Sequence, residues 1–222
     1  MQRIVIGFCC IVLVAAAVAQ AQAVINVDFQ PTGQVTYDPP ADAGPYPGAI
    51  ATDTWNGFDL GPATWLDGGG DNLSNVTSAP LVESDGTATI TTVTLDGGET
   101  SYQGPGSPLA AALYNDVWHG RGDFNMTWSI DNLAPDGLYD VYFYSGAGPW
   151  TEYAATIFLI GAPAKGVVYT APSAWVEDDN YVLFTDVVAV GGTIIGFVQG
   201  PPTQYEDEAY VNGLTIVGDF IP

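Results

Sequence analysis

Hydrophobic and polar residues alternate strictly in the middle of the chain. Residues 124–131 place large apolar side chains on every second position, which is the period of a strand with one buried face. Pro135 and Gly137 then favour a turn, because proline presets the first turn torsion and glycine tolerates positive φ. Residues 138–144 alternate again, so the pattern predicts a β-hairpin. We expect these side chains to be buried: Phe124, Met126, Trp128, Ile130, Tyr139, Val141 and Phe143. We expect these to be more exposed: Asn125, Thr127 and Asp140.

Shorter alternating runs predict strands elsewhere. They cover residues 24–29, a short stretch at Trp55 and Phe58, and residues 88–95, 153–160, 166–170, 181–190, 193–199 and 209–217. A change of phase at Thr91 and Thr92 suggests a β-bulge, and Gly191-Gly192 is typical of a two-residue hairpin. Residues 97–117 look irregular, with one helical turn at residues 109–114. Because no helical period persists beyond about two turns, the pattern predicts an all-β antiparallel sandwich of the jelly-roll kind.

Four segments carry a family resemblance. They are residues 25–29 (INVDF), 133–144 (LAPDGLYDVYFY), 181–187 (YVLFTDV) and 211–216 (VNGLTI). In them the chain resembles secreted galactose-binding-domain-like sandwiches of planctomycete-type bacterial exoproteins, often ones with a PEP-CTERM sorting tail. It is also distantly similar to malectin-like and carbohydrate-binding modules. The resemblance implies a non-catalytic, lectin-like function. No Pro-Glu-Pro motif or terminal apolar helix follows Val217, which favours release over surface sorting.

Residues 1–23 have the order of a secretory signal peptide. Arg3 precedes an apolar run, and Ala21-Gln22-Ala23 forms a small-residue cleavage site. We expect cleavage to leave one domain, residues 24–222, in the extracellular space. Both cysteines lie in the leader, so the mature domain is expected to contain no disulfide. No second apolar segment of membrane-spanning length follows, so we expect no membrane contact after cleavage.

The charge of the chain limits its partners. Arg121 and Lys165 are the only strong bases outside the leader, against 25 Asp and Glu residues. Such a field repels phosphate backbones, so nucleic acid is not an expected partner. Nor do we expect an enzyme, because His119 is the single histidine and no catalytic motif is present. The acidity indicates either solubility or binding of divalent cations, since calcium prefers oxygen ligands.

The loops suggest where a ligand would bind. Consecutive strands of an antiparallel sandwich reverse direction, so alternate loops collect at one end. The short turns at residues 135–137, 161–165 and 191–192 fall at one end. The other, which we call the loop end, gathers residues 117–123, 145–152, 171–180 and 200–208. Its candidate ligand-binding residues are Trp118, His119, Arg121, Trp150, Trp175 and Tyr205.

Aromatic rings stack on sugars while polar groups bind their hydroxyls, so the loop end predicts a site for an extracellular polysaccharide or glycan. The alternative is that the tryptophans plug the end of the sandwich. The loop end also holds candidate metal ligands: Glu177, Asp178, Asp179, Glu206 and Asp207. Carboxylates that lie close together repel one another. We therefore expect either that a structural calcium ion binds between them or that these side chains point apart into water. The competing function is that of a structural or extracellular-matrix protein.

Overall fold

The computed structural model describes residues 22–30, 48, 54–60, 73, 75–102, 113, 116–121, 126–145, 154–168, 175–200 and 208–222. Within these ranges the chain forms strands and no α-helix. No helix in this described part is long and apolar enough to cross a membrane. Of the predicted leader only Gln22 and Ala23 lie within it, and the first strand already begins at Ala23, opposite Gly218.

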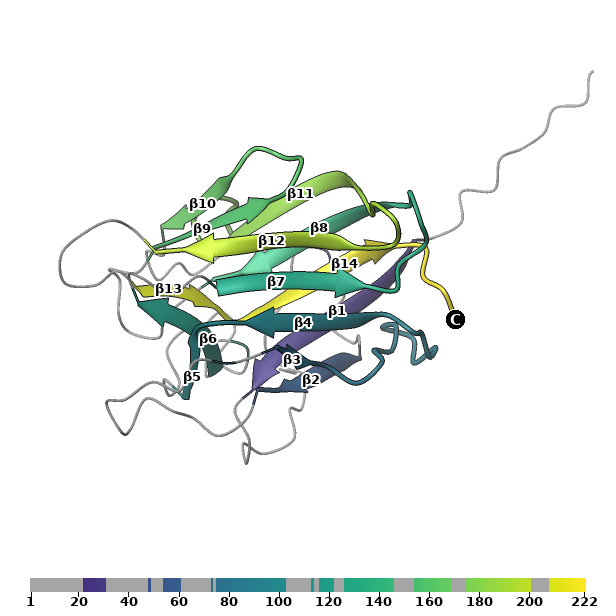
Figure 1. Ribbon diagram of the computed structural model, residues 1–222, viewed down its shortest axis with the longest axis horizontal. Helices are drawn as coiled ribbons and strands as arrows, with labels where there is room; N and C mark the ends of the chain where they lie inside the picture. Colours follow the sequence, from purple (N-terminus) through teal and green to yellow (C-terminus); the bar gives the residue numbers. More distant parts are fainter. Residues whose placement is uncertain are drawn as a thin grey trace, which may run out of the picture.

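Two sheets pack face to face (Figure 1). The five-stranded sheet has the order β11 (Tyr181–Val188), β8 (Leu138–Tyr144), β14 (Gly213–Gly218), β1 (Ala23–Gln30) and β2 (Trp55–Asp59). The six-stranded sheet has the order β10 (Lys165–Val168), β9 (Ala154–Leu159), β12 (Ile194–Gln199), β7 (Met126–Asp131), β4 (Thr92–Asp96) and β3 (Val76–Thr77). A third sheet at one end has the order β13 (Glu208–Val211), β6 (Asp116–Arg121) and β5 (Glu99–Tyr102). The predicted all-β sandwich is confirmed, although β1 and β2 pair in parallel.

The core lies between the two large sheets and follows the predicted faces. Phe143 of β8 contacts Trp128 of β7, with ring centroids 4.8 Å apart. Phe184 of β11 meets the Phe143 ring edge-on at 6.4 Å. The described residues predicted to be buried are all buried, while Thr127 is exposed and Asp140 half-buried. Phe124 and Asn125 lie outside the described residues. Hydrophobic alternation therefore set the inward side of each central strand correctly.

The central hairpin prediction is wrong, because β7 and β8 belong to opposite sheets. The connection between them is an arch, held by the neighbouring turn: Leu133 N–H donates to Gly192 O, and Ala189 N–H donates to Gly137 O, both at 2.9 Å. Gly191-Gly192 does form a local turn, closed by a Val190–Thr193 bridge. The strands that it joins, β11 and β12, also lie in opposite sheets. Alternation identifies the buried side of a strand but not its hydrogen-bonded neighbour.

Other irregularities were also misplaced. Burial alternates without interruption at Thr89, Thr91, Val93 and Leu95, so no bulge occurs at Thr91–Thr92. Position 91 is buried although it holds a polar residue, so the hydrophobic pattern alone shows a change of phase that the strand does not have. The register shift lies in β11, between Phe184 and Val187. Residues 97–117, predicted to be irregular, contain β5 and the start of β6, and the predicted strand 209–217 is divided at Asn212 between two sheets.

Candidate functional site

Among the described residues, the strand ends that flank the short turns and the longer connections lie at the two ends of the sandwich as the strand directions predicted. At the short-turn end, the 132–137 arch and the 189–193 turn exchange the hydrogen bonds described above. At the loop end, Ser145 N–H donates to Asn180 O at 3.1 Å, and Ser145 Oγ donates to Tyr210 O at 2.6 Å. Residues 116–121, however, are strand β6 and not a loop. The loop end is therefore closed in part by the third sheet.

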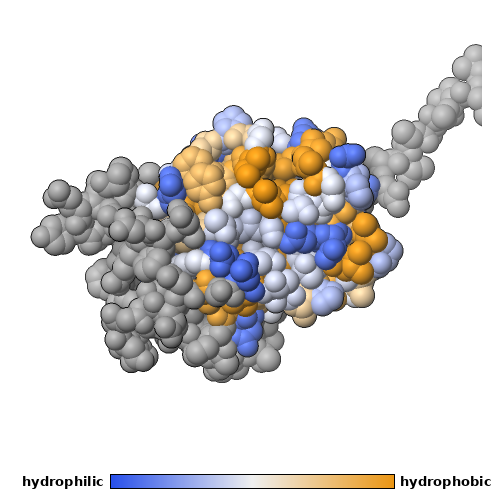
Figure 2. Space-filling view, viewed as in Figure 1, coloured by the Kyte–Doolittle hydropathy of each residue, from blue (hydrophilic) through white to orange (hydrophobic). Residues whose placement is uncertain are grey.

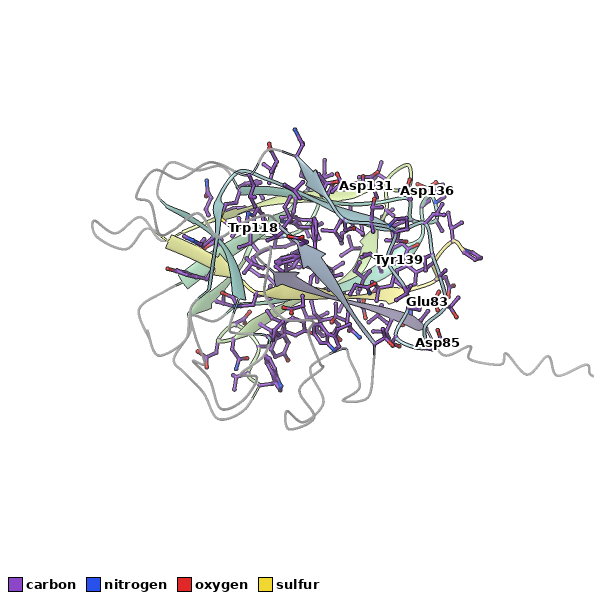
Figure 3. All side chains as sticks on the ribbon, turned by 90° about the horizontal axis from the view of Figure 1, so that it is seen from below. Glu83, Asp85, Trp118, Asp131, Asp136 and Tyr139 are labelled. Carbon is purple, nitrogen blue, oxygen red and sulfur yellow. The ribbon has the colours of Figure 1, made fainter. Side chains whose placement is uncertain are left out.

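Trp118 belongs to the core. Its side chain is fully buried, its indole Nε1–H donates to Gly97 O at 2.8 Å, and its ring meets Phe29 edge-on. Figure 3 labels it inside the molecule. His119 is buried as well and stacks on Tyr210, with centroids 5.4 Å apart. Neither ring presents a face to a ligand, so we reassign both from the predicted binding site to the interior. The tertiary pairing of β6 with β13 encloses them.

Several of the predicted site residues lie wholly or partly outside the described part of the chain. Arg121 ends β6, opposite Glu208, but its side chain lies outside the described residues. Trp150 and Tyr205 lie outside them entirely, as do Glu206 and Asp207. Their predicted roles in glycan or calcium binding stay predictions.

Trp175 lies in an aromatic cluster on the outer face of the five-stranded sheet. Its ring is half-buried, 5.5 Å from Tyr144 and 6.4 Å from Tyr181. Beneath it, Tyr144 Oη–H donates to Thr215 Oγ1, which donates to Asn26 Oδ1, each at 2.8 Å. Burial, then the charges of Glu177 and Asp178, raise the pKa of Tyr181. This cluster is largely a packed and hydrogen-bonded layer, with Trp175 at its edge.

Glu177 forms an ion pair that sequence reasoning missed. Its carboxylate Oε1 lies 2.9 Å from Lys165 Nζ, which also lies 5.8 Å from the Phe184 ring centroid. The pair connects edge strand β10 of one sheet to the segment entering edge strand β11 of the other. Lys165 is thus a base beside the acidic loop. Among the described residues, no three His, Cys, Asp or Glu side chains are grouped to hold a metal ion.

A groove of about 640 Å³ crosses the outer face of the six-stranded sheet. On β7 the small side chains Thr127 and Ser129 point outward, beside longer ones on β12 and the Asp96 side chain on β4. The register aligns Phe197 with Thr127 and Thr127 with Asp96 in one row across the sheet. The next row consists of Ile195, Ser129 and Thr94. The volume of the groove lies in the range of small-ligand sites, roughly 300–1,000 Å³.

One wall of the groove is aromatic and apolar. Phe197 stacks on Phe158 of the adjacent strand, with centroids 4.2 Å apart and planes within 7° of parallel. Phe158 covers one face of the Phe197 ring and does not line the groove, so the opposite Phe197 face forms the wall. Ile160 and Ile195 extend this wall along the strands. Figure 2 shows the hydrophobic residues gathered over β9 and β12, beside a polar area over β7 and β4.

The opposite wall carries hydrogen-bonding groups. Thr94 Oγ1 lies 2.9 Å from Thr77 Oγ1, and Asp96 Oδ1 accepts the Asn75 N–H at 3.0 Å. At one end of β7, Asp131 accepts hydrogen bonds from Ser129 Oγ and Thr193 Oγ1 at 2.6 and 3.1 Å. These bonds fix the side chains in place. The wall thus presents hydroxyl and carboxylate oxygens across a narrow floor from a fixed aromatic ring.

Sequence reasoning missed the groove although its signal was present. Thr127 was predicted to point outward, and an aromatic residue at position 197, out of phase with Val198, is an outward-facing ring on a strand. What the pattern lacked was the order of β12, β7 and β4 in the sheet. No family model, curated protein or solved structure matched the chain when it was compared with each. The functional inference therefore comes from the groove's own chemistry.

Proposed function

We propose that this protein is a secreted, non-catalytic glycan-binding module and that the groove over β12, β7 and β4 is its ligand site. The observation that supports the proposal most is the row formed by Phe197, Thr127 and Asp96. The apolar face of a sugar ring packs on an aromatic ring, while its hydroxyls need hydrogen-bond partners at the edge. Phe197 supplies the ring, and the threonine and aspartate supply the partners.

The dimensions of the groove fit part of a polysaccharide chain. Ile195 and Gln199 both line it on β12. They are four positions apart along the strand, which is roughly 13 Å at about 3.3 Å per residue. A groove on a sheet face, unlike a closed pocket, can hold an internal segment of a long glycan. We therefore favour a polymeric ligand over a free monosaccharide.

Secretion rests on the signal-like order of residues 1–23. Sequencing the amino terminus of protein recovered from the culture medium tests it, and an intact Met1 would contradict it. Cleavage after Ala23 also removes the residue opposite Gly218, leaving Val24 and Val217 as the first pair of β1 with β14.

A glycan array followed by calorimetric titration with the strongest hit tests the binding site. Phe197→Ala is expected to weaken binding roughly tenfold or more, because stacking and ring burial are both lost. Phe197→Tyr keeps the ring and should retain most of the affinity. Since Phe197 is only half-buried, circular dichroism and the melting temperature should show both variants folded.

Trp175→Ala provides the matched comparison, because it removes an aromatic ring from the other sheet, at the predicted loop-end site. If Trp175→Ala abolishes binding and Phe197→Ala does not, the ligand occupies the loop end instead of the groove. If the unaltered protein binds no glycan on the array, the proposal fails.

A structural or extracellular-matrix role is the second candidate, favoured by the apolar rim of the groove. Ile160 is 66% exposed and Ile195 is 44% exposed, adjacent to the stacked phenylalanines. Exposed apolar surface of this kind also suits contact between protein copies. Sedimentation velocity at rising concentration tests this role, with Ile195→Lys expected to suppress assembly. A monomer at every concentration would oppose it.

A further inference from the structure

The groove carries negative charge without a positive counterpart. Asp96 lines it, and Asp131 lies two positions beyond the lining residue Ser129 on the same face of β7. None of the described residues that line the groove is basic. Lys165 is paired with Glu177 between the edge strands β10 and β11. A ligand in the groove therefore meets the carboxylate oxygens of Asp96, which no described residue of the lining neutralises.

The position of Asp96 allows it to act on a ligand directly. Its Oδ1 accepts the Asn75 N–H at 3.0 Å, and Oδ2 has no hydrogen bond to any described residue. The register places Asp96 two strands from Phe197, with Thr127 between them. Neighbouring strands are about 4.8 Å apart, so the backbones at Asp96 and Phe197 are separated by roughly 9–10 Å. A sugar ring seated against Phe197 lies beside the Asp96 carboxylate.

From this placement, and resting on the proposed function, we infer that the groove selects glycans that carry protonated amino groups. Asp96 is the specificity-determining residue. A cationic amine beside Asp96 is attracted, whereas a uronate or sulfate is repelled both locally and by the chain's net charge of −22. A neutral sugar can stack on Phe197 but gains nothing from the charge. The ligand class is thus an amino-sugar polymer with free amines.

Two oligosaccharides with the same sugar backbone test the inference. They are a glucosamine hexamer and its fully N-acetylated form, each titrated into the protein at pH 6 in low salt. We expect the unaltered protein to bind the amine form roughly two- to fivefold more tightly, the scale of one exposed ion pair. Asp96→Asn keeps Oδ1 as an acceptor for Asn75, so it should fold normally. It should bring the ratio of the two affinities to about one, because any change in hydrogen bonding to the sugar hydroxyls is common to both hexamers.

Asp136→Asn is the matched control, since it removes the same charge from an exposed residue in the 132–137 arch, outside the groove lining. It should leave the preference intact. Three outcomes overturn the inference: equal affinity for both hexamers, a preference that survives Asp96→Asn, or one that Asp136→Asn reduces equally. In the last case the protein's overall charge attracts the amine. If Phe197→Ala loses binding to both hexamers, the groove is still supported as the binding site. The proposed function and the amine preference can therefore fail independently of each other.

Discussion

The phenol of Tyr139 is hydrogen-bonded to the backbone of Asp219, a residue 80 positions later in the chain. Its hydroxyl donates to Asp219 O at 2.8 Å and accepts the Ala134 N–H at 3.0 Å. The ring is buried at the short-turn end (Figure 3). A Cβ at Gly218 would collide with that ring, so glycine permits the close approach. Tyr139 thus joins the arch between the sheets to the end of β14.

Replacing Tyr139 by Phe should lower the free energy of unfolding by about 1–3 kcal/mol, because the half-buried Ala134 N–H loses its acceptor and Asp219 O loses its donor. Urea unfolding followed by tryptophan fluorescence measures the change. Tyr181→Phe, at a half-buried tyrosine on the other face of the sheet, is the control and should cost less. Equal midpoints for Tyr139→Phe and the unaltered protein would contradict the structural role.

Alkaline pH should destabilise the protein through its tyrosines. Burial, as the largest cause, raises the pKa values of Tyr139, Tyr142 and Tyr181 above their usual value of about 10. A raised pKa means that the folded state holds the proton more tightly than the unfolded state. The stability that the protonated tyrosines contribute to the folded state is fully present below pH 10 and is lost as pH rises through their folded-state pKa values. Melting temperatures measured from pH 8 to 12 should fall above about 10, and a flat profile would contradict this.

Phe143→Ala should cost about 3–5 kcal/mol, because it removes a buried ring that contacts Trp128 and Phe184 from both sheets. Phe197→Ala, on the outer face, is the control and should cost much less. Chemical denaturation measures both. A small loss of unfolding free energy in Phe143→Ala would argue against the packing of the two sheets, as would a predominantly helical circular dichroism spectrum.

Gly196 and Gly166 make a matched pair of strand glycines in one sheet. A Cβ at Gly196 would collide with the Phe158 carbonyl oxygen and the Trp128 ring, whereas at Gly166 the nearest atom is Ala155 O at 3.8 Å. Gly196→Ala should therefore destabilise by about 1–3 kcal/mol or more through overpacking. Gly166→Ala should be close to neutral. Thermal unfolding compares them, and equal effects would rule out the close contact at Gly196.

The calcium prediction is testable by thermal unfolding of chelator-washed protein. If the Glu177–Asp179 loop and the segment containing Glu206 share an ion, calcium at a hundred times its dissociation constant adds about 2.7 kcal/mol. For a domain of this size that is roughly 5–10 °C. Magnesium serves as the control for charge screening. An unchanged melting temperature at millimolar calcium would contradict the calcium site and indicate that the acidic residues serve solubility alone.

Much of the fold followed from the order of residues alone. Alternation across residues 124–144 set which side of each central strand is buried, since side chains of a strand point to opposite faces. Residues such as Trp128 and Phe143 were placed correctly for that reason. The reversal of successive strands also put the short turns at one end, and the described strand ends that border the longer connections at the other.

Strand partners and sheet order were decided only by the tertiary structure. The same alternation suits a hairpin and an arch, because both bury the same side chains, and only packing sent β7 and β8 to different sheets. Trp118 resembled a loop aromatic until the third sheet enclosed it. The groove required Thr127 to lie between Phe197 and Asp96, three residues far apart in sequence. Register between strands is a long-range property, so no local pattern contains it.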